Sequence, residues 1–342
     1  MPARFSLAAF IALVFVGLLP SEKAAAASFD CAAATKPLEK LICADAELSK
    51  LDEEMAKAYG EHLAQFSEEA HAKLRQGQRS WLKMVRMLCG YWIDHAGPNG
   101  ETALSCLKEE YSNRLPGLQA RGNSEPYRFF YVSRYEVVPM RESSSAGDKG
   151  ELVRHELAYP QIDAPRTPET ERWNKVVAEK VEGDYLNPGV EADLDTVDYD
   201  VGYRLNSVFA GFIGGEFWTN YYARGWPHPG YYSGSSNYLL EAGKELTAND
   251  IFSTQMPWQD GLAIRALPII KYKHPDLKVI LSDISEHLSD PRRWTISAEA
   301  LRIEIDLNRI YGYGKGVSEL DVPWSEIKSY LRPDLPIALK LD

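Results

Sequence analysis

All four cysteines of this 342-residue chain lie in its first third, and this placement limits what that part can become. An even number of cysteines in a short exported segment is typical of a disulfide framework. A zinc site is disfavoured, because no Cys-x-x-Cys or Cys-x-x-His spacing occurs. We expect two disulfide bonds, with all three pairings left open, among Cys31, Cys43, Cys89 and Cys106.

The first 27 residues have the parts of a secretory signal peptide. Arg4 supplies a positive charge, residues 5–19 are apolar, and small residues place a cleavage site near Ala26 or Ala27. The apolar stretch is shorter than the roughly 20 residues of a membrane span. We therefore expect an exported chain, periplasmic or secreted, with no membrane anchor after cleavage; a retained anchor is the alternative.

A helical pattern runs through residues 34–121. Apolar side chains recur at three- and four-residue spacing near 35–63, 68–89 and 104–118. A helix with one apolar stripe is stable when it packs against others. The sequence thus predicts a small α-helical bundle over residues 28–121, with the cysteines tying the helix ends together.

After residue 122 the pattern changes to strands mixed with helices. Residues 127–138 are aromatic and β-branched, and residues 300–307 alternate between apolar and polar. Thr167 and Pro168 begin a helix, and residues 197–224 read as two strands around Gly214-Gly215. We expect residues 122–342 to form an α+β domain with a mixed or antiparallel sheet.

The negative charge of the chain is concentrated in this second part. The formal net charge is −11, and residues 122–342 contain 34 acidic and 24 basic side chains. Such a surface repels nucleic acid and anionic lipid and attracts basic partners. An ordinary acidic surface without a partner is the plain alternative.

Motifs for catalysis or for metal binding are missing. The seven histidines form no His-Glu-x-x-His pair, and no Gly-x-Ser-x-Gly motif occurs. Residues 312–316, "GYGKG", fit neither a phosphate loop nor a dinucleotide motif. Residues 193–200, "DLDTVDYD", fail as a calcium loop because Val197 occupies a ligand position. We expect no enzyme activity, no metal and no cofactor.

The first part resembles the LprI-type lysozyme inhibitor family. The resemblance covers most of residues 29–118 and rests on the cysteine spacing together with Glu39, Tyr59 and Trp81. Ala46 departs from the family, which often has proline there. The matching stretches are "FDCAAATKPLEKLICADAELSKLDEEMAKAY", "RQGQRSWLKMVRMLC" and "CLKEEYSNRL".

The second part is similar, over roughly residues 150–332, to the extracellular domain of RsiV-type anti-sigma factors. That resemblance implies a lysozyme-sensing surface; we expect no anti-sigma role, because no sigma-binding or transmembrane segment is recognised. Gly312-Tyr313 stands where the family often has Pro-Tyr. The stretches are "AYPQIDAPRTPETERWNKVV", "HPGYYSGSSNYLLEAGKELTANDIF" and "ALRIEIDLNRIYGYGKGVSELDVPWSEIKSYL".

Both resemblances imply the same partner, a basic c-type lysozyme. An acidic protein is steered toward it, and rigid aromatic anchors bind a cleft at low entropic cost. Packing of the same aromatics within the sheet or its turns is the structural alternative. The candidate contact residues lie at residues 226–232 and in the "GYGKG" region: Trp226, His228, Tyr231, Tyr232, Tyr311 and Tyr313.

The sequence therefore predicts a lysozyme-binding protein that protects peptidoglycan by occluding the muramidase cleft. A peptidoglycan- or glycan-binding module without catalysis is the second hypothesis, because aromatic faces beside hydroxyls suit sugars. An unrecognised hydrolase of the cell envelope is the third.

Overall fold

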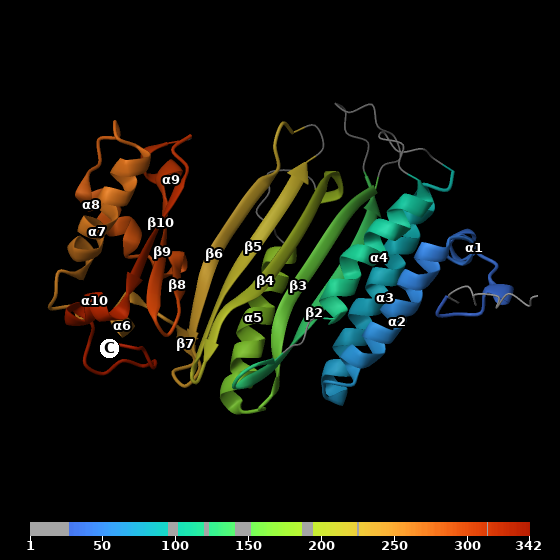
Figure 1. Ribbon diagram of the computed structural model, residues 1–342, viewed down its shortest axis with the longest axis horizontal. Helices are drawn as coiled ribbons and strands as arrows, with labels where there is room; N and C mark the ends of the chain where they lie inside the picture. Colours follow the sequence, from blue (N-terminus) through green and yellow to red (C-terminus); the bar gives the residue numbers. More distant parts are fainter. Residues whose placement is uncertain are drawn as a thin grey trace, which may run out of the picture.

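A computed structural model of the chain describes residues 27–94, 102–119, 123–140, 152–186, 194–223, 226–312 and 314–342. Residues 1–26 of the expected signal peptide therefore lie outside the described residues. Three parts lie side by side in the molecule (Figure 1): a helical part, a long curved sheet, and a smaller part that holds the C-terminus. The predicted fold class is confirmed, since a disulfide-tied helical region precedes a strand-rich α+β region.

The helical part has two disulfides, and they select one of the three possible pairings. Cys31–Cys43 joins a short 3₁₀ turn to α1, and Cys89–Cys106 joins the end of α3 to the start of α4. The buried core of this part includes Leu48, Trp81 and Leu107. The helices are α1 (Pro37–Ala44), α2 (Ala46–Leu63), α3 (Glu68–Tyr91) and α4 (Ala103–Gln119).

A break at Asp45 divides the first predicted helical stretch. Asp45 has an extended backbone, and its carboxylate accepts a hydrogen bond of 2.9 Å from the backbone N–H of Leu48. An aspartate in this position caps the first turn of a new helix. The cap is enough to end α1 and begin α2 without the proline that the LprI-type family often has at the position of Ala46.

The central sheet has seven strands within the described residues, and their order in space is their order in the sequence. All neighbours are antiparallel except β3 and β4, which are parallel and connected through α5 (Pro168–Leu186). A parallel pair needs such a long crossover. The strands are β1 (Asn123–Ser124), β2 (Tyr127–Pro139), β3 (Leu152–Ala164), β4 (Val197–Phe209), β5 (Phe212–Ala223), β6 (Gly230–Leu239) and β7 (Lys244–Glu245).

Helix α5 covers one face of this sheet. Its buried Trp173, Val177 and Val181 pack against Leu157 of β3 and Tyr203 of β4. The helix begins at Pro168, as the Thr167-Pro168 pair predicts. Alternate residues of β3 to β5 are buried beneath α5, and the residues between them are left half-exposed on the opposite face.

The predicted turn at Gly214-Gly215 is wrong. The chain turns instead at Ala210 and Gly211, where Gly211 has a φ of 79°, and the two glycines lie inside β5. A Cβ atom on Gly215 would lie 2.2 Å from the ring of the buried Tyr203. The glycines therefore make room for a neighbouring ring, and a sequence pattern cannot distinguish such a close approach from a turn.

The C-terminal part has its own core and a small antiparallel sheet in the order β10-β9-β8. Phe252 stacks on Trp258 with ring centroids 4.3 Å apart, and Trp294 packs edge-on against both. Asn237 of β6 donates to the carbonyl of Trp294 over 2.8 Å, which links this part to the central sheet. The elements are α6 (Ala248–Ile251), α7 (Trp258–Lys273), α8 (Leu281–Leu288), β8 (Trp294–Ile296), β9 (Ala300–Asp306), α9 (Leu307–Tyr311), β10 (Val317–Pro323) and α10 (Trp324–Ile327).

Helix α3 covers the outer edge of β2, beyond the short pairing with β1. The hydroxyl of Ser80 accepts a hydrogen bond of 3.2 Å from the backbone N–H of Tyr135. Gly77 of α3 lies directly against Ser133 of β2. An exposed sheet edge invites pairing with other chains, and a covering helix prevents it. The helical part and the sheet therefore pack as neighbours, although the predicted boundary between them remains a prediction.

Charged and polar contacts fix the far end of the same interface. Ser67 caps α3 through its hydroxyl oxygen and donates that hydroxyl to the carboxylate of Asp163 on β3. Asp163 is nearly inaccessible to solvent and also pairs with Arg128, with Nη2 and Oδ2 2.7 Å apart. None of the helices in the described residues is long and apolar enough to cross a membrane.

The contact between α3 and β2 predicts that Gly77→Ala destabilises the protein. The new Cβ atom would lie 2.6 Å from Ser133 Oγ and 3.0 Å from its carbonyl oxygen. We expect the free energy of unfolding to fall by about 1–3 kcal/mol in urea titrations. Gly60→Ala on α2 is the control, since nothing lies within 4 Å. The free energy of unfolding of Gly60→Ala should rise by about 0.5–1 kcal/mol. An equal rise in Gly77→Ala would contradict the proposed close packing.

His287 predicts a pH dependence of stability. Its Nε2 accepts a hydrogen bond of 3.1 Å from the backbone N–H of Asp306, which requires a neutral ring nitrogen. Burial, followed by the nearby Arg293, lowers the pKa of His287 from 6.5 to about 4. At a pH between these two pKa values, the His287 ring binds a proton in the unfolded chain but stays neutral in the folded protein.

The free energy of unfolding should therefore fall as the pH is lowered from about 6.5 to about 4. We expect His287 to contribute about 1–2 kcal/mol to that fall, less than the full pKa difference implies, because the ring is only partly buried. Urea titrations of the wild type and of His287→Gln at several pH values measure it. An identical pH dependence in both proteins would exclude this role for His287.

Candidate functional site

The face of the central sheet opposite α5 carries large polar and aromatic side chains. The strand registers place five of them in one continuous row across five strands, because Tyr135 pairs with Glu156, Glu156 with Asp200, Asp200 with Asn220, and Asn220 with Tyr231. Strand neighbours on one face lie close enough to interact. We call this surface the open face; it comprises Tyr131, Tyr135, Arg154, Glu156, Asp198, Asp200, Arg204, Glu216, Trp218, Asn220 and Tyr231.

Trp218 lies flat at the centre of the open face. Its indole ring covers Gly202 of β4, where a Cβ atom would lie 2.3 Å from the ring. The indole Nε1 donates a hydrogen bond of 2.6 Å to Asp200 Oδ2, and Asn220 Nδ2 donates to the same oxygen over 3.1 Å. The hydrogen bond to Asp200 and the close approach to Gly202 hold the ring against the sheet, and Asn220 helps to fix the carboxylate. The ring is therefore a half-exposed aromatic platform beside a carboxylate.

The helical part contacts the open face through a charged network. Arg154 Nη1 of β3 lies 2.6 Å from Glu110 Oε1 of α4, and its Nε contacts Glu156. The backbone N–H of Arg154 donates to Asp198 over 2.8 Å. Burial raises the pKa of both Glu110 and Glu156, although Arg154 opposes the shift. The network brings four charged groups to the place where helix and sheet meet.

A cavity of about 480 Å³ lies between the helices and the open face. Tyr59 and His62 of α2 line it from one side, and Tyr131 and Tyr135 of β2 from the other. Arg114 of α4 donates to the hydroxyl of Tyr135 over 2.8 Å. The open face therefore continues beneath the helices, so that both parts of the chain contribute to one concave surface.

Four of the predicted contact residues gather at the connection between β5 and β6. Trp226 and His228 are exposed, and the Trp226 ring lies 6.0 Å from Tyr221. Tyr231 and Tyr232 lie in β6 and not in a loop, which corrects the predicted contact loop. Successive strand residues point to opposite faces. Tyr231 therefore joins the open face, whereas Tyr232 is on the opposite face, where it is 55% exposed and its ring lies 5.9 Å from that of Phe217.

Tyr231 has the most suitable position for a contact residue. Its side chain is 61% exposed, and its hydroxyl donates a hydrogen bond of 3.2 Å to Glu216 on β5. The residues in the "GYGKG" region differ. Tyr311 is half-buried in α9, and its hydroxyl accepts from the backbone N–H of Ile280 over 3.1 Å, which is a structural contact. Tyr313 lies outside the described residues.

The centre of the open face is formed by residues that were not predicted from the sequence. Glu156, Asp200, Trp218 and Asn220 come from three strands and meet only when the sheet forms. A signal was present, because polar residues alternate with apolar ones around Asp198–Arg204. In the described part of the chain, no group of three or more His, Cys, Asp or Glu side chains could hold a metal ion.

The network at Glu110 predicts a stability effect that an adjacent residue does not share. The Glu110 side chain is 5% exposed, so Glu110→Gln leaves Arg154 with a weaker partner in a buried place. We expect a loss of about 1–3 kcal/mol in urea titrations. The exposed Glu109 is the control, and Glu109→Gln should change stability by less than about 0.5 kcal/mol. Equal effects would show that the network does not join helix and sheet.

Comparison with known proteins gives a family match and several distant structural likenesses, two of which are described here. No curated protein sequence matches the chain. A DUF3298 family member from Bacteroides fragilis shares 10% identity at a TM-score of 0.40, over 62% of this chain and 96% of that one. A DUF3298 family protein from Pseudomonas aeruginosa shares 12% identity at a TM-score of 0.41, over 61% of this chain and 96% of that one. Values this low support no conclusion about function. Residues 31–118 match the family model described as "Lysozyme inhibitor LprI".

Proposed function

We propose that this chain is an exported lysozyme-binding protein that inhibits its partner and catalyses no reaction itself. The observation that carries the proposal is the match of residues 31–118 to the LprI lysozyme inhibitor family. The match covers α1 to α4, and three of these helices, α2, α3 and α4, form one wall of the cavity beside the open face. The family therefore supports the partner class, and the fold suggests where the partner contacts the molecule.

The charge of the open face supports a basic partner. Glu156, Asp198 and Asp200 lie near one another on β3 and β4, and Arg154 is shared between Glu110 and Glu156. A c-type lysozyme is strongly basic, so complementary charge would speed the encounter and would weaken in salt. The excess of acidic residues after residue 122 acts in the same direction over a longer range.

Exposed aromatic side chains supply the short-range part of the proposal. Tyr231 stands at one end of the open face and Tyr131 at the other, and both are exposed. Trp226 is exposed on the connection between β5 and β6, close to Tyr231 in sequence. Aromatic anchors on strands lose little entropy when they bind. We infer that these rings enter or cover the muramidase cleft and so protect peptidoglycan.

Two sequence features support action outside the cytoplasm. The first is the signal-like N-terminus, and the second is the pair of disulfides, which persist in oxidising compartments. The RsiV-type resemblance of residues 150–332 would give the second part a lysozyme-sensing surface as well. The family match does not extend to that part, so this interpretation stays a prediction.

A glycan-binding module of the cell envelope is the second candidate function. The observation in its favour is the indole of Trp218, which lies flat beside Asp200 and Asn220 as a sugar platform would. Retention on insoluble peptidoglycan at moderate salt, lost in Trp218→Ala, would support this function. Absence of pelleting would exclude it.

The test of inhibition uses the purified chain from residue 28 onward with hen-type lysozyme. We expect slower lysis of bacterial cells and a complex on size-exclusion chromatography that weakens as salt is added. Full lysis at a large molar excess of the protein, with no complex at low salt, would end the proposal.

A pair of tyrosine variants tests the location of the contact. Tyr231→Ala should weaken the complex by about tenfold, because it removes an exposed ring from the open face. Tyr272→Ala is the matched control, since Tyr272 is 90% exposed on α7 and does not belong to the open face. Calorimetric titration measures both. Equal affinities for the two variants would place the contact elsewhere.

A further inference from the structure

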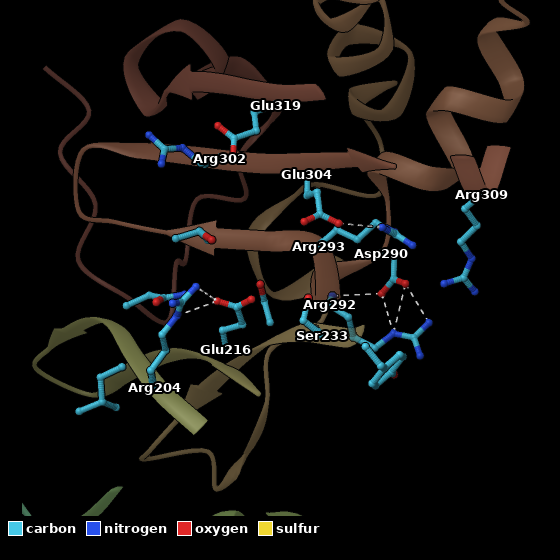
Figure 2. Close-up of a pocket in the computed structure, with 16 residues that line it drawn as sticks. Arg204, Glu216, Ser233, Asp290, Arg292, Arg293, Arg302, Glu304, Arg309 and Glu319 are labelled. Atoms are coloured by element: carbon cyan, nitrogen blue, oxygen red, sulfur yellow. Dashed lines mark hydrogen bonds and ion pairs between the residues drawn. The ribbon is translucent and has the colours of Figure 1, made fainter. Parts of the chain in front are cut away.

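A second cavity lies between the central sheet and the small C-terminal sheet. Its volume is about 540 Å³, and strands β4 to β6 line it on one side and the segment from Asp290 to Glu319 on the other (Figure 2). No residue of the helical part lines it. We call it the polar cavity, because its lining is dominated by arginine and carboxylate side chains. It shares Arg204 and Glu216 with the open face, and the other charged residues that line it lie outside the proposed lysozyme contact.

One end of the polar cavity is basic. Arg292, Arg293 and Arg309 gather there (Figure 2). Arg292 is neutralised by Asp290, with Nη2 and Oδ2 2.8 Å apart. Arg309 forms no ion pair with any residue that the structure describes, and burial together with this neighbouring guanidinium lowers the pKa of Arg293. Two arginines thus repel each other at this end.

The other end is acidic. Glu304 of β9 and Glu319 of β10 are direct cross-strand partners, and like charges in that position destabilise a sheet. Glu216 of β5 faces them across the cavity and is paired with Arg204, whose Nε lies 2.9 Å from Glu216 Oε2 (Figure 2). Burial raises the pKa of Glu304 against the opposing effect of Arg293, and Asp306, Glu216 and Glu319 raise it further. Within the described residues Glu319 forms no ion pair.

A weak bridge connects the two ends, and hydroxyl groups line the space between them. Arg293 Nη1 lies 3.4 Å from Glu304 Oε1, which leaves both charges partly unsatisfied. Ser233, Ser235 and Thr295 add neutral hydrogen-bonding groups. Most of the other charges are already paired, as in Arg302 with Asp321. The cavity therefore offers an unmatched cation site and an unmatched anion site within one enclosure.

We propose that the polar cavity binds a zwitterionic ligand of the amino-acid or short-peptide class. The ligand carboxylate would lie on Arg293 and Arg309, where a planar guanidinium binds a carboxylate well. The ligand ammonium would lie between Glu304 and Glu319, where a positive charge relieves the repulsion between the two carboxylates. A ligand with a single charge would satisfy only one end, and a polyanion would be repelled by the acidic end.

The test uses the dipeptide Ala-Ala as the probe, with the full chain from residue 28 and NMR titration as the readout. We expect saturable shift changes for the zwitterion and binding that is about tenfold weaker for each of two derivatives. Ala-Ala amide lacks the carboxylate, and N-acetyl-Ala-Ala lacks the ammonium. Equal binding of all three compounds, or no binding of the zwitterion up to about 20 mM, would overturn the proposal.

Two variants test which end of the polar cavity binds the ligand carboxylate and which end binds the ammonium. Arg309→Gln should lower the affinity for Ala-Ala about tenfold while leaving the affinity for Ala-Ala amide unchanged. Glu319→Gln should lower the affinity for Ala-Ala while leaving the affinity for N-acetyl-Ala-Ala unchanged. Both side chains are exposed, so folding should be retained. Arg332→Gln is the matched control, because Arg332 pairs with Asp334 and does not line the cavity.

The outcome is separate from that of the lysozyme experiment. The variants Arg309→Gln and Glu319→Gln should inhibit lysozyme-driven cell lysis to the same extent as the wild type, because neither residue belongs to the open face. Loss of Ala-Ala binding in Arg332→Gln as well, or unchanged binding in Arg309→Gln, would show that the probe binds outside the polar cavity.

Discussion

The contact between α3 and β2 is the interaction on which the rest of the structure depends. β2 is a long strand at the edge of the central sheet, and only its first residues pair with β1. Gly77 lets the helix approach Ser133 closely, and Ser80 accepts the N–H of Tyr135. This contact places α4 where Glu110 can reach Arg154. The concave surface beneath the helices exists because the edge is covered by a helix and not by another strand.

Local structure was largely predictable from the sequence, because it depends on neighbours in the chain. The apolar spacing in α3, the start of α5 at Pro168 and the alternation in β9 are local signals, and the structure confirms them. The pair Gly214-Gly215 misled because its cause, the ring of Tyr203, is distant in sequence.

The candidate site was predicted only in part for the same reason. Tyr231 and Trp226 stand in one aromatic stretch and could be picked from the sequence. The row from Tyr135 to Asn220 could not, because the parallel pairing of β3 with β4 sets its register. The polar cavity is likewise a product of two sheets meeting.

The disulfides have a consequence for where the molecule can mature. Cys31–Cys43 and Cys89–Cys106 both lie in the helical part, and each can add about 2–4 kcal/mol once formed. In a reducing compartment the helices lack this support, so the packing that covers β2 is less stable. The sheet has no cysteine of its own, yet the stability of its covered edge depends on the oxidation of thiols elsewhere in the chain. Redox conditions thus affect the stability of both parts, although only one of them contains the disulfides.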